Sequence, residues 1–226
     1  MSIVTIGTAE MRNVDCMEYM NGLPDKAFDL AIVDPPYGIG ASESFAGETR
    51  KSGNGCALKT AFDKKSWDNA IPNKDYFDEL KRVSKNQIIW GANYMTNFLP
   101  ASMGWIVWDK DNGTTKFSDC ELAYTSFDIR LRKFLFTWNG MIQGDMKNKE
   151  QRIHPTQKPT KLYEWLLTNY AKPGDRILDT HLGSMSSVIA CLNLGFKVVG
   201  CELDSDYFKA GCERVAQSQK QVRMFA

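Results

Sequence analysis

Residues 176–202 read RILDTHLGSMSSVIACLNLGFKVVGCE, and this stretch decides the fold class of the 226-residue chain. Its first four residues, Arg176–Asp179, are expected to form a strand with Ile177 and Leu178 at its centre. A helix is expected over 186–194, because Gly195 follows it as a natural C-terminal cap. A second strand is expected over 197–201. Strand, helix and strand in this order form a βαβ unit, which predicts an α/β fold with a parallel sheet and helices on both faces.

Polar residues stand where the strands of this unit end, which is where open parallel sheets bind ligands. Asp179 ends the first strand, and the turn 182–184 (Leu-Gly-Ser) follows it. Glu202 ends the second strand, about 20 residues after the glycine, where a carboxylate can bind a ribose. Met185 and Ser187 stand where a dinucleotide motif has further glycines, which argues against NAD. This segment alone leaves a plain strand-to-helix turn as an equal alternative.

A second apolar run, Phe28–Val33, leads directly into Asp34-Pro35-Pro36-Tyr37. The run is typical of a buried parallel strand, so the tetrapeptide is expected at a strand end. The prolines cannot donate backbone hydrogen bonds, and they leave carbonyl oxygens free as acceptors beside the Asp34 carboxylate. Tyr37 adds an aromatic face. The tetrapeptide therefore offers two acceptors for an exocyclic NH2 group and a plate for a flat base, and is more than a strand terminator.

These groups suit methylation of the N6 amine of adenine. Two acceptors for the amine hydrogens favour a pyramidal nitrogen, whose lone pair can then attack a sulfonium methyl group in line. Asp34 is expected to accept one hydrogen bond and the Pro35 carbonyl the other, and no cysteine nucleophile is needed. Tyr37 is expected to act through its ring, so Tyr37→Phe should retain most activity. A base in duplex DNA must leave the stack to reach such a site.

The bulk properties restrict the class of protein without naming one. The formal net charge of +1 neither predicts nor excludes a nucleic-acid partner, since local charge decides. None of the six cysteines forms a C-x-x-C pair, so neither a structural nor a catalytic metal is expected. No signal peptide or membrane span is evident, and a cytoplasmic protein with reduced thiols is expected.

The chain is expected to form one domain, residues 1–226, without internal repeats. Two segments, 38–70 and 127–151, are expected to contact DNA, because they gather Lys, Arg, Asn and aromatic side chains. Residues 38–70 and 140–151 are expected to be loops. This recognition region is small, which favours a short target site or a homodimer. The remaining elements are expected to be helices at 76–84, near 93–99 and at 160–170, and strands at 87–90, 105–108, 120–126 and 133–138.

The motifs resemble those of the amino-type DNA methyltransferases. Residues 34–37 are similar to the catalytic motif of that family, and residues 179–184 to a variant of its cofactor motif, Asp-Pro-Phe-x-Gly-Ser-Gly. Residues 201–204 resemble the strand end that contacts the ribose. Residues 154–159 (His-Pro-Thr-Gln-Lys-Pro) resemble the segment before the cofactor motif in the permuted β group, and residues 13–18 its N-terminal segment. The catalytic motif precedes the cofactor motif, which is the order of that group.

This resemblance implies a Rossmann-like, mostly parallel sheet of seven strands with a circularly permuted motif order. It implies a DNA methyltransferase that uses S-adenosylmethionine to methylate N6 of a flipped-out adenine in double-stranded DNA. The implied catalytic residues are Asp34, Pro35, Pro36 and Tyr37. The implied cofactor-binding residues are Asp15, Cys16, Asp34, Thr156, Lys158, Asp179, Leu182, Gly183, Ser184, Ser186 and Glu202, with Thr156 and Lys158 over the methionyl end.

The sequence also departs from the family pattern. Thr180 and His181 replace Pro and Phe, Met185 replaces Gly, and Val14 replaces the N-terminal Gly. A half-buried packing role is favoured for His181 over a role as a ligand donor.

Several alternatives stay open at this point. One is N4 methylation of cytosine, which the family associates more with Ser in place of Asp34. Versions with Asn-Pro-Pro-Tyr act on RNA or on protein glutamine. A third alternative is a catalytically silent nucleic-acid-binding relative. The target sequence, a partner nuclease and membership of a restriction-modification system do not follow from the sequence.

Overall fold

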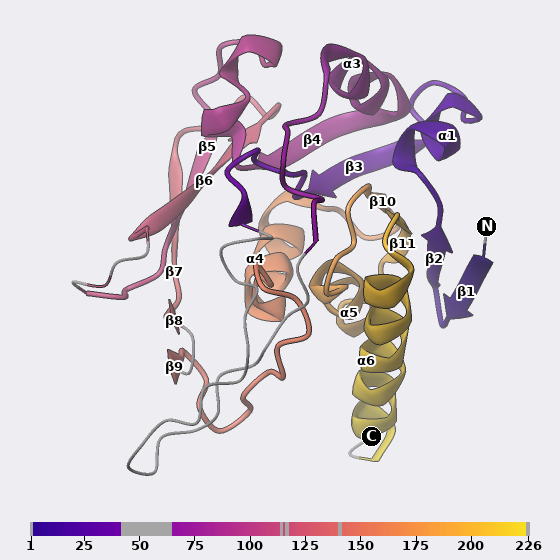
Figure 1. Cartoon of the computed structure of the whole chain (residues 1–226), viewed down its shortest axis with the longest axis vertical. Coiled ribbons are helices and arrows are strands. Elements are labelled where there is room, and N and C mark those ends of the chain that lie inside the picture. Colours follow the sequence, from indigo (N-terminus) through magenta and orange to yellow (C-terminus); the bar gives the residue numbers. More distant parts are fainter. Residues whose placement is uncertain (1, 42–64, 114, 116–117, 140–141, 225–226) are drawn as a thin grey trace.

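The computed structural model describes residues 2–41, 65–113, 115, 118–139 and 142–224 (Figure 1). The strands are β1 (Ser2–Ile6), β2 (Ala9–Asn13), β3 (Phe28–Val33), β4 (Ser84–Trp90), β5 (Trp105–Asp109), β6 (Cys120–Thr125), β7 (Arg132–Leu135), β8 (Trp138–Asn139), β9 (Ile142–Gln143), β10 (Arg176–Asp179) and β11 (Lys197–Glu202). The α-helices are α1 (Cys16–Asn21), α3 (Lys74–Val83), α4 (Thr160–Tyr170), α5 (Ser186–Asn193) and α6 (Ser205–Met224), and short 3-10 helices cover Ala92–Tyr94 and Thr96–Phe98.

Within the described residues, the main sheet contains nine strands in the order β1-β2-β11-β10-β3-β4-β6-β5-β7. Its centre, from β2 to β4, is parallel throughout. β6 runs antiparallel to both of its neighbours. The mostly parallel α/β fold is confirmed, but the expected strand number of seven needs a correction. β1 and β7 add one strand at each edge of the sheet that runs from β2 to β5, and a motif resemblance carries no information about such edges.

Helices cover both faces of the sheet. α1 and α3 lie on one face, and α4, α5 and α6 lie on the other (Figure 1). β3 contacts both layers: Leu30 and Ile32 belong to the core under α4 and α5, whereas Ala31 and Val33 belong to the core under α3. Side chains alternate between the faces of a strand, so a strand covered on both sides must be apolar throughout. This explains the continuous apolar run before the Asp-Pro-Pro-Tyr tetrapeptide.

The two expected recognition segments are only partly loops. Residues 132–135 form β7, which pairs with β5 at the sheet edge, and Trp138 is buried. The remainder of 127–151 includes the exposed side chains of Lys147 and Lys149. Within the segment 38–70, residues 42–64 lie outside the described part of the chain. No helix among the described residues is long and apolar enough to cross a membrane.

The helix expected near 93–99 consists instead of the two short 3-10 helices. It follows Gly91, which adopts a left-handed conformation at φ +66°, and it ends before Pro100. Met95 between the two 3-10 helices has φ −125°, outside the helical range, so they do not join into one helix.

Candidate active site

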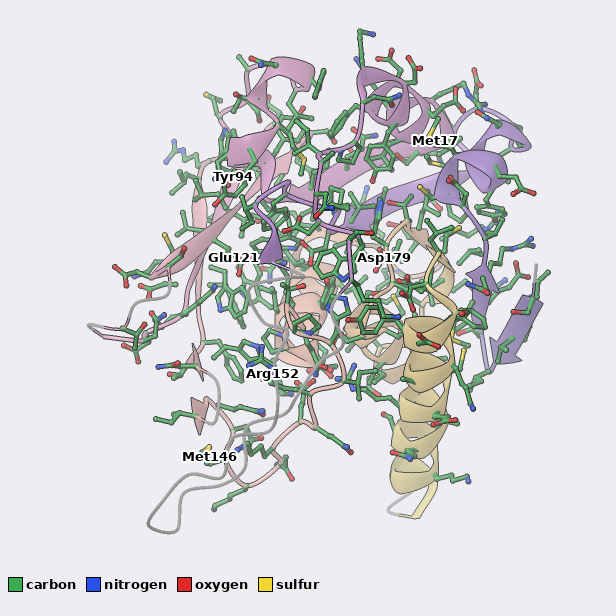
Figure 2. The ribbon with its side chains drawn as sticks, viewed as in Figure 1. Met17, Tyr94, Glu121, Met146, Arg152 and Asp179 are labelled. Carbon is green, nitrogen blue, oxygen red and sulfur yellow. The ribbon has the colours of Figure 1, made fainter. Side chains whose placement is uncertain are left out.

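The topology brings the two halves of the expected site to one edge of the sheet. β3 pairs with β10, and β10 pairs with β11, all in parallel. Asp34 follows β3, Asp179 ends β10 and Glu202 ends β11, so all three lie at the carboxyl edge. In Figure 2, Glu121 lies to the left of Asp179, and Tyr94 lies above Glu121.

Asp34 is held by an ion pair with Lys158. The Lys158 ammonium Nζ lies 2.6 Å from Asp34 Oδ2, and only 4% of the Lys158 side chain is exposed. From the sequence, Lys158 is expected near the methionyl end of the cofactor. In the structure its ammonium pairs with the carboxylate of the tetrapeptide, which joins the segment 154–159 to residues 34–37.

Tyr37 joins the same network through its hydroxyl group. The hydroxyl donates to Asp34 Oδ1 at 2.7 Å and accepts from Lys158 Nζ at 3.0 Å, and Glu121 Oε2 is an alternative acceptor at 3.3 Å. Its ring stacks on the ring of Tyr94, with centroids 5.4 Å apart, and packs against Gly91. A Cβ atom at residue 91 would lie 2.0 Å from the Tyr37 ring, so glycine is required there. Tyr37 therefore contributes a hydroxyl group as well as a ring face.

Two residues that the sequence did not single out complete this network. Glu121 of β6 accepts from Lys158 through Oε2 at 3.1 Å and from Lys110 through Oε1 at 2.6 Å. Lys110 directly follows β5, and its side chain is 14% exposed. The only sequence signal was their position, Lys110 just after one expected strand and Glu121 at the start of another.

Burial and charge act against each other in this cluster. Burial raises the pKa of Asp34 above its ordinary value, and the ammonium of Lys158 opposes that rise. Burial would also raise the pKa of Glu121, but Lys158 and Lys110 together lower it to about 2. Burial would lower the pKa of Lys158, but Asp34 and Glu121 raise it. The ammonium therefore stays charged between the two carboxylates.

The carboxylate of Glu202 accepts hydrogen bonds from the backbone of the expected cofactor turn and from the residues after β11. The backbone N–H of Gly183 donates to Glu202 Oε2 at 2.7 Å, and the N–H of Asp204 donates to Oε1 at 2.8 Å. Gly183 has φ +47°, a left-handed conformation that favours glycine. Each carboxylate oxygen of Glu202 keeps a lone pair for a further donor. Leu182, in the same turn, is buried and donates its N–H to the carbonyl of Cys201.

Asp179 also stabilises this turn through hydrogen bonds. Its carboxylate accepts from the hydroxyl of Ser187 and from the N–H of His181, and the residue is 2% exposed. Burial raises the pKa of Asp179 to about 7. His181 is half-buried, as expected, with its ring edge against Tyr76.

The departure from the family motif at Met185 has a structural counterpart. Met185 has φ +60°, so it adopts a conformation that favours the glycine found there in the family. Its side chain is fully buried and occupies the space that a Cβ atom on Gly211 of α6 would need. Ser184 and Ser186 beside it are buried, and both accept hydrogen bonds from Arg214 of α6.

The N-terminal segment also reaches this edge. The N–H of Val14 donates to the carbonyl of Glu202, and the exposed Asp15 caps α1 by accepting from the N–H of Met17. Cys16 is half-buried, and burial raises the pKa of its thiol to about 12, so it remains protonated. Thr156, from the segment 154–159, is half-buried and hydrogen bonds to His154 Nδ1.

The end of the segment 38–70 holds the Asp-Pro-Pro-Tyr tetrapeptide in place. The buried carboxylate of Asp68 accepts from the N–H groups of Tyr37, Gly38 and Ala41. Lys65, expected to contact DNA, instead pairs with Asp204 and Asp206, each at 2.7 Å. Its ammonium is therefore engaged within the protein.

Comparison with known proteins gives consistent relatives. A family model of N6/N4 methyltransferases, described as a DNA methylase, matches residues 129–213. YubD of Escherichia coli (strain K12), named as a methylase, is 26% identical, and the match covers 94% of this chain and 92% of YubD. The type II methyltransferase M.HpaI of Haemophilus parainfluenzae is 24% identical, with coverage of 89% and 72%.

Solved structures share the fold at low sequence identity. The complex of M1.HpyAVI with SAM has a TM-score of 0.56 at 18% identity, covering 91% of this chain and 99% of that one. The cytosine-N4-specific PvuII DNA methyltransferase has a TM-score of 0.58 at 11% identity, covering 94% and 90%. In motif order, in sequence and in fold, the chain is therefore similar to the amino-type (N6/N4) DNA methyltransferases.

Proposed function

We propose that this protein methylates N6 of adenine in double-stranded DNA and takes the methyl group from S-adenosylmethionine. The observation that carries the proposal is the position of Asp34-Pro35-Pro36-Tyr37. The tetrapeptide stands at the carboxyl end of β3, directly beside the β10 turn with Gly183 and Glu202. An amine acceptor and a nucleoside site at adjacent strand ends are what such a transfer requires.

The residues of the β10–β11 turn fit an adenosyl ligand. Glu202 offers carboxylate oxygens for ribose hydroxyl groups, and Gly183 lets a ligand approach its backbone closely. Asp15 lies on the segment that Val14 ties to Glu202. When bound, S-adenosylmethionine supplies the electrophilic methyl group, and M1.HpyAVI, which shares the fold, has been solved in complex with it.

Asp34 acts on the amine in this proposal. Its carboxylate accepts a hydrogen bond from the exocyclic NH2 group and stabilises the positive charge that develops on the nitrogen during transfer. The same carboxylate can then take up the surplus proton. Lys158 and the Tyr37 hydroxyl orient Asp34 and favour its ionised form, against the rise in its pKa that burial causes. The Pro35 carbonyl is the second proposed acceptor.

Tyr94 offers the stacking face for the extruded base. The ring of Tyr37 already contacts Tyr94 on one side and Gly91 on another, and the Lys158 ammonium lies 5.3 Å from its centroid. Tyr94 is 45% exposed and continues this stack toward solvent. A flat base that reaches Asp34 can therefore stack against Tyr94.

Adenine is proposed over cytosine because Asp34 occupies the position at which cytosine-directed relatives more often carry Ser. The PvuII enzyme, which shares the fold, is cytosine-N4-specific, so the base is a point for experiment. The proposed DNA contacts lie in the segments 38–70 and 127–151, where Lys147 and Lys149 are exposed.

The test is methyl transfer from tritiated S-adenosylmethionine to DNA that lacks adenine and cytosine methylation. Asp34→Ala should lower the single-turnover rate about 100- to 1000-fold, the cost of losing one preorganised electrostatic contact. Cofactor affinity by calorimetry and the circular dichroism spectrum should stay close to wild type, since Lys158 keeps Glu121 as a partner. A wild-type transfer rate in Asp34→Ala would rule out the proposed role of the tetrapeptide.

A further inference from the structure

Two charged groups near Asp34, the carboxylate of Glu121 and the ammonium of Lys110, have no part in the chemistry proposed so far. One ammonium, Lys158 Nζ, faces two carboxylates, at 2.6 Å from Asp34 and 3.1 Å from Glu121. The ammonium of Lys110 lies 2.6 Å from the other oxygen of Glu121. Asp34, Lys158, Glu121 and Lys110 therefore form a row of four charges that alternate in sign.

The two ammonium groups of this row lie next to buried tryptophan rings. The Lys158 ammonium is 5.7 Å from the ring centroid of Trp90, and the Lys110 ammonium is 5.2 Å from that of Trp108. The two indole rings meet edge to face, and both tryptophans are almost completely buried. An unbalanced charge in such surroundings is costly, so the equal number of positive and negative groups matters.

We propose that Lys110 and Glu121 are positioning residues for Asp34: Lys110 neutralises Glu121, so that the ammonium of Lys158 remains available to Asp34. Glu121 in turn holds Lys158 through a second ion pair. The inference deepens the proposed function and rests on it, because Asp34 is the group that meets the amine. Neither Lys110 nor Glu121 needs to touch the substrate for this role.

The arrangement dictates opposite effects of the two charges on Asp34. Without the Lys110 charge, Lys158 is shared between two ionised carboxylates, so Asp34 holds its proton more tightly and its pKa rises. Without the Glu121 charge, a negative neighbour is lost and the pKa of Asp34 falls. The other titratable groups coupled to this cluster are Tyr37, Tyr76 of α3, Tyr163 of α4, Asp179 of β10 and His154. The three tyrosines have raised pKa values and stay neutral, and burial lowers the pKa of His154 to about 3, so it stays neutral as well.

The experiment compares Lys110→Met, Glu121→Gln and the double variant in the full chain. The carboxyl 13C resonance of Asp34, assigned with Asp34→Asn, is titrated by NMR, and single-turnover methyl transfer to unmethylated DNA is followed against pH. The midpoint should rise by about one pH unit in Lys110→Met and fall by about one unit in Glu121→Gln. The double variant restores the charge balance and should titrate close to wild type.

Two matched controls separate charge from packing. Lys110→Arg keeps the charge and should titrate like wild type. Lys85→Met breaks an exposed ion pair with Asp29 elsewhere on the sheet and should leave the midpoint unchanged. Shifts in the same direction for both single variants, or a shifted midpoint in Lys110→Arg or in the double variant, would overturn the proposal. The NMR titration measures the pKa of Asp34 in the absence of DNA. If the wild-type protein transferred no methyl group, the proposed function would be rejected, whereas the inference about Lys110 and Glu121 would still be tested by the titration.

Discussion

The hydroxyl group of Tyr37 gives the sharpest prediction about the active site. Sequence alone assigns Tyr37 a stacking role, under which Tyr37→Phe keeps most activity. In the structure the hydroxyl donates to Asp34 Oδ1 and accepts from Lys158 Nζ. Tyr37→Phe removes both hydrogen bonds and leaves the ring stacked on Tyr94. We therefore expect a substantial loss of activity from this substitution.

The expected loss follows from hydrogen bonds to charged groups, which contribute about 1.5–3 kcal/mol each. If one such contribution is lost in the transition state, the rate falls roughly 10- to 100-fold. Single-turnover transfer of tritiated methyl groups to DNA measures it, with cofactor affinity and thermal midpoint as checks of folding. Tyr94→Phe is the matched control, because it keeps the stacked ring and leaves the Asp34 network intact. A wild-type rate in Tyr37→Phe would return Tyr37 to a role through its ring alone.

Three further predictions concern the base, the DNA and the cofactor turn. Tyr94→Ala should weaken binding of DNA by about 1–3 kcal/mol through loss of stacking, whereas Tyr94→Phe should bind like wild type in a fluorescence titration. Reversing the charges of Lys147 and Lys149 should weaken DNA binding and flatten its dependence on salt, and an unchanged slope would place the DNA elsewhere. Burial raises the pKa of Asp179 to about 7, so Asp179 binds its proton more tightly in the folded protein than in the unfolded chain. The free energy of unfolding therefore falls as the pH rises from about 4 to 7. Asp179→Asn should therefore flatten the decline in unfolding free energy over that range in urea titrations, and a decline as steep as in wild type would contradict the raised pKa.

The parts of the fold set by local sequence were predictable. The run Phe28–Val33, the helix Thr160–Tyr170 and the strand Arg176–Asp179 have the bounds expected from their apolar patterns. A strand was expected over 133–138, and β7 covers Arg132–Leu135, so its existence was predicted but not its bounds. Its pairing with β5 depends on the order of distant strands. An edge strand needs only one partner, so its own pattern is weak.

The sequence predicted which residues of the site stand at strand ends, but not the ion pairs and hydrogen bonds that connect them. Asp34 and Glu202 follow from their positions after strands, whereas the ion pair of Lys158 with Asp34 joins segments far apart in the chain. Glu121 and Lys110 look like ordinary surface charges until β6 and β5 pair and bring them together. The orientation of the Tyr37 hydroxyl depends on the absence of a side chain at Gly91. Such contacts depend on three-dimensional packing.

The central claim is that Asp34 serves the methylation of an adenine amine in DNA. Its most direct test is mass spectrometry of nucleosides from the DNA of cells that lack other DNA methyltransferases and express this protein. The proposed mechanism predicts N6-methyladenine with the wild-type chain and its absence with Asp34→Ala expressed to the same level. N4-methylcytosine as the sole modified base would contradict the assignment to adenine, and N6-methyladenine at the wild-type level in Asp34→Ala would contradict the role of Asp34.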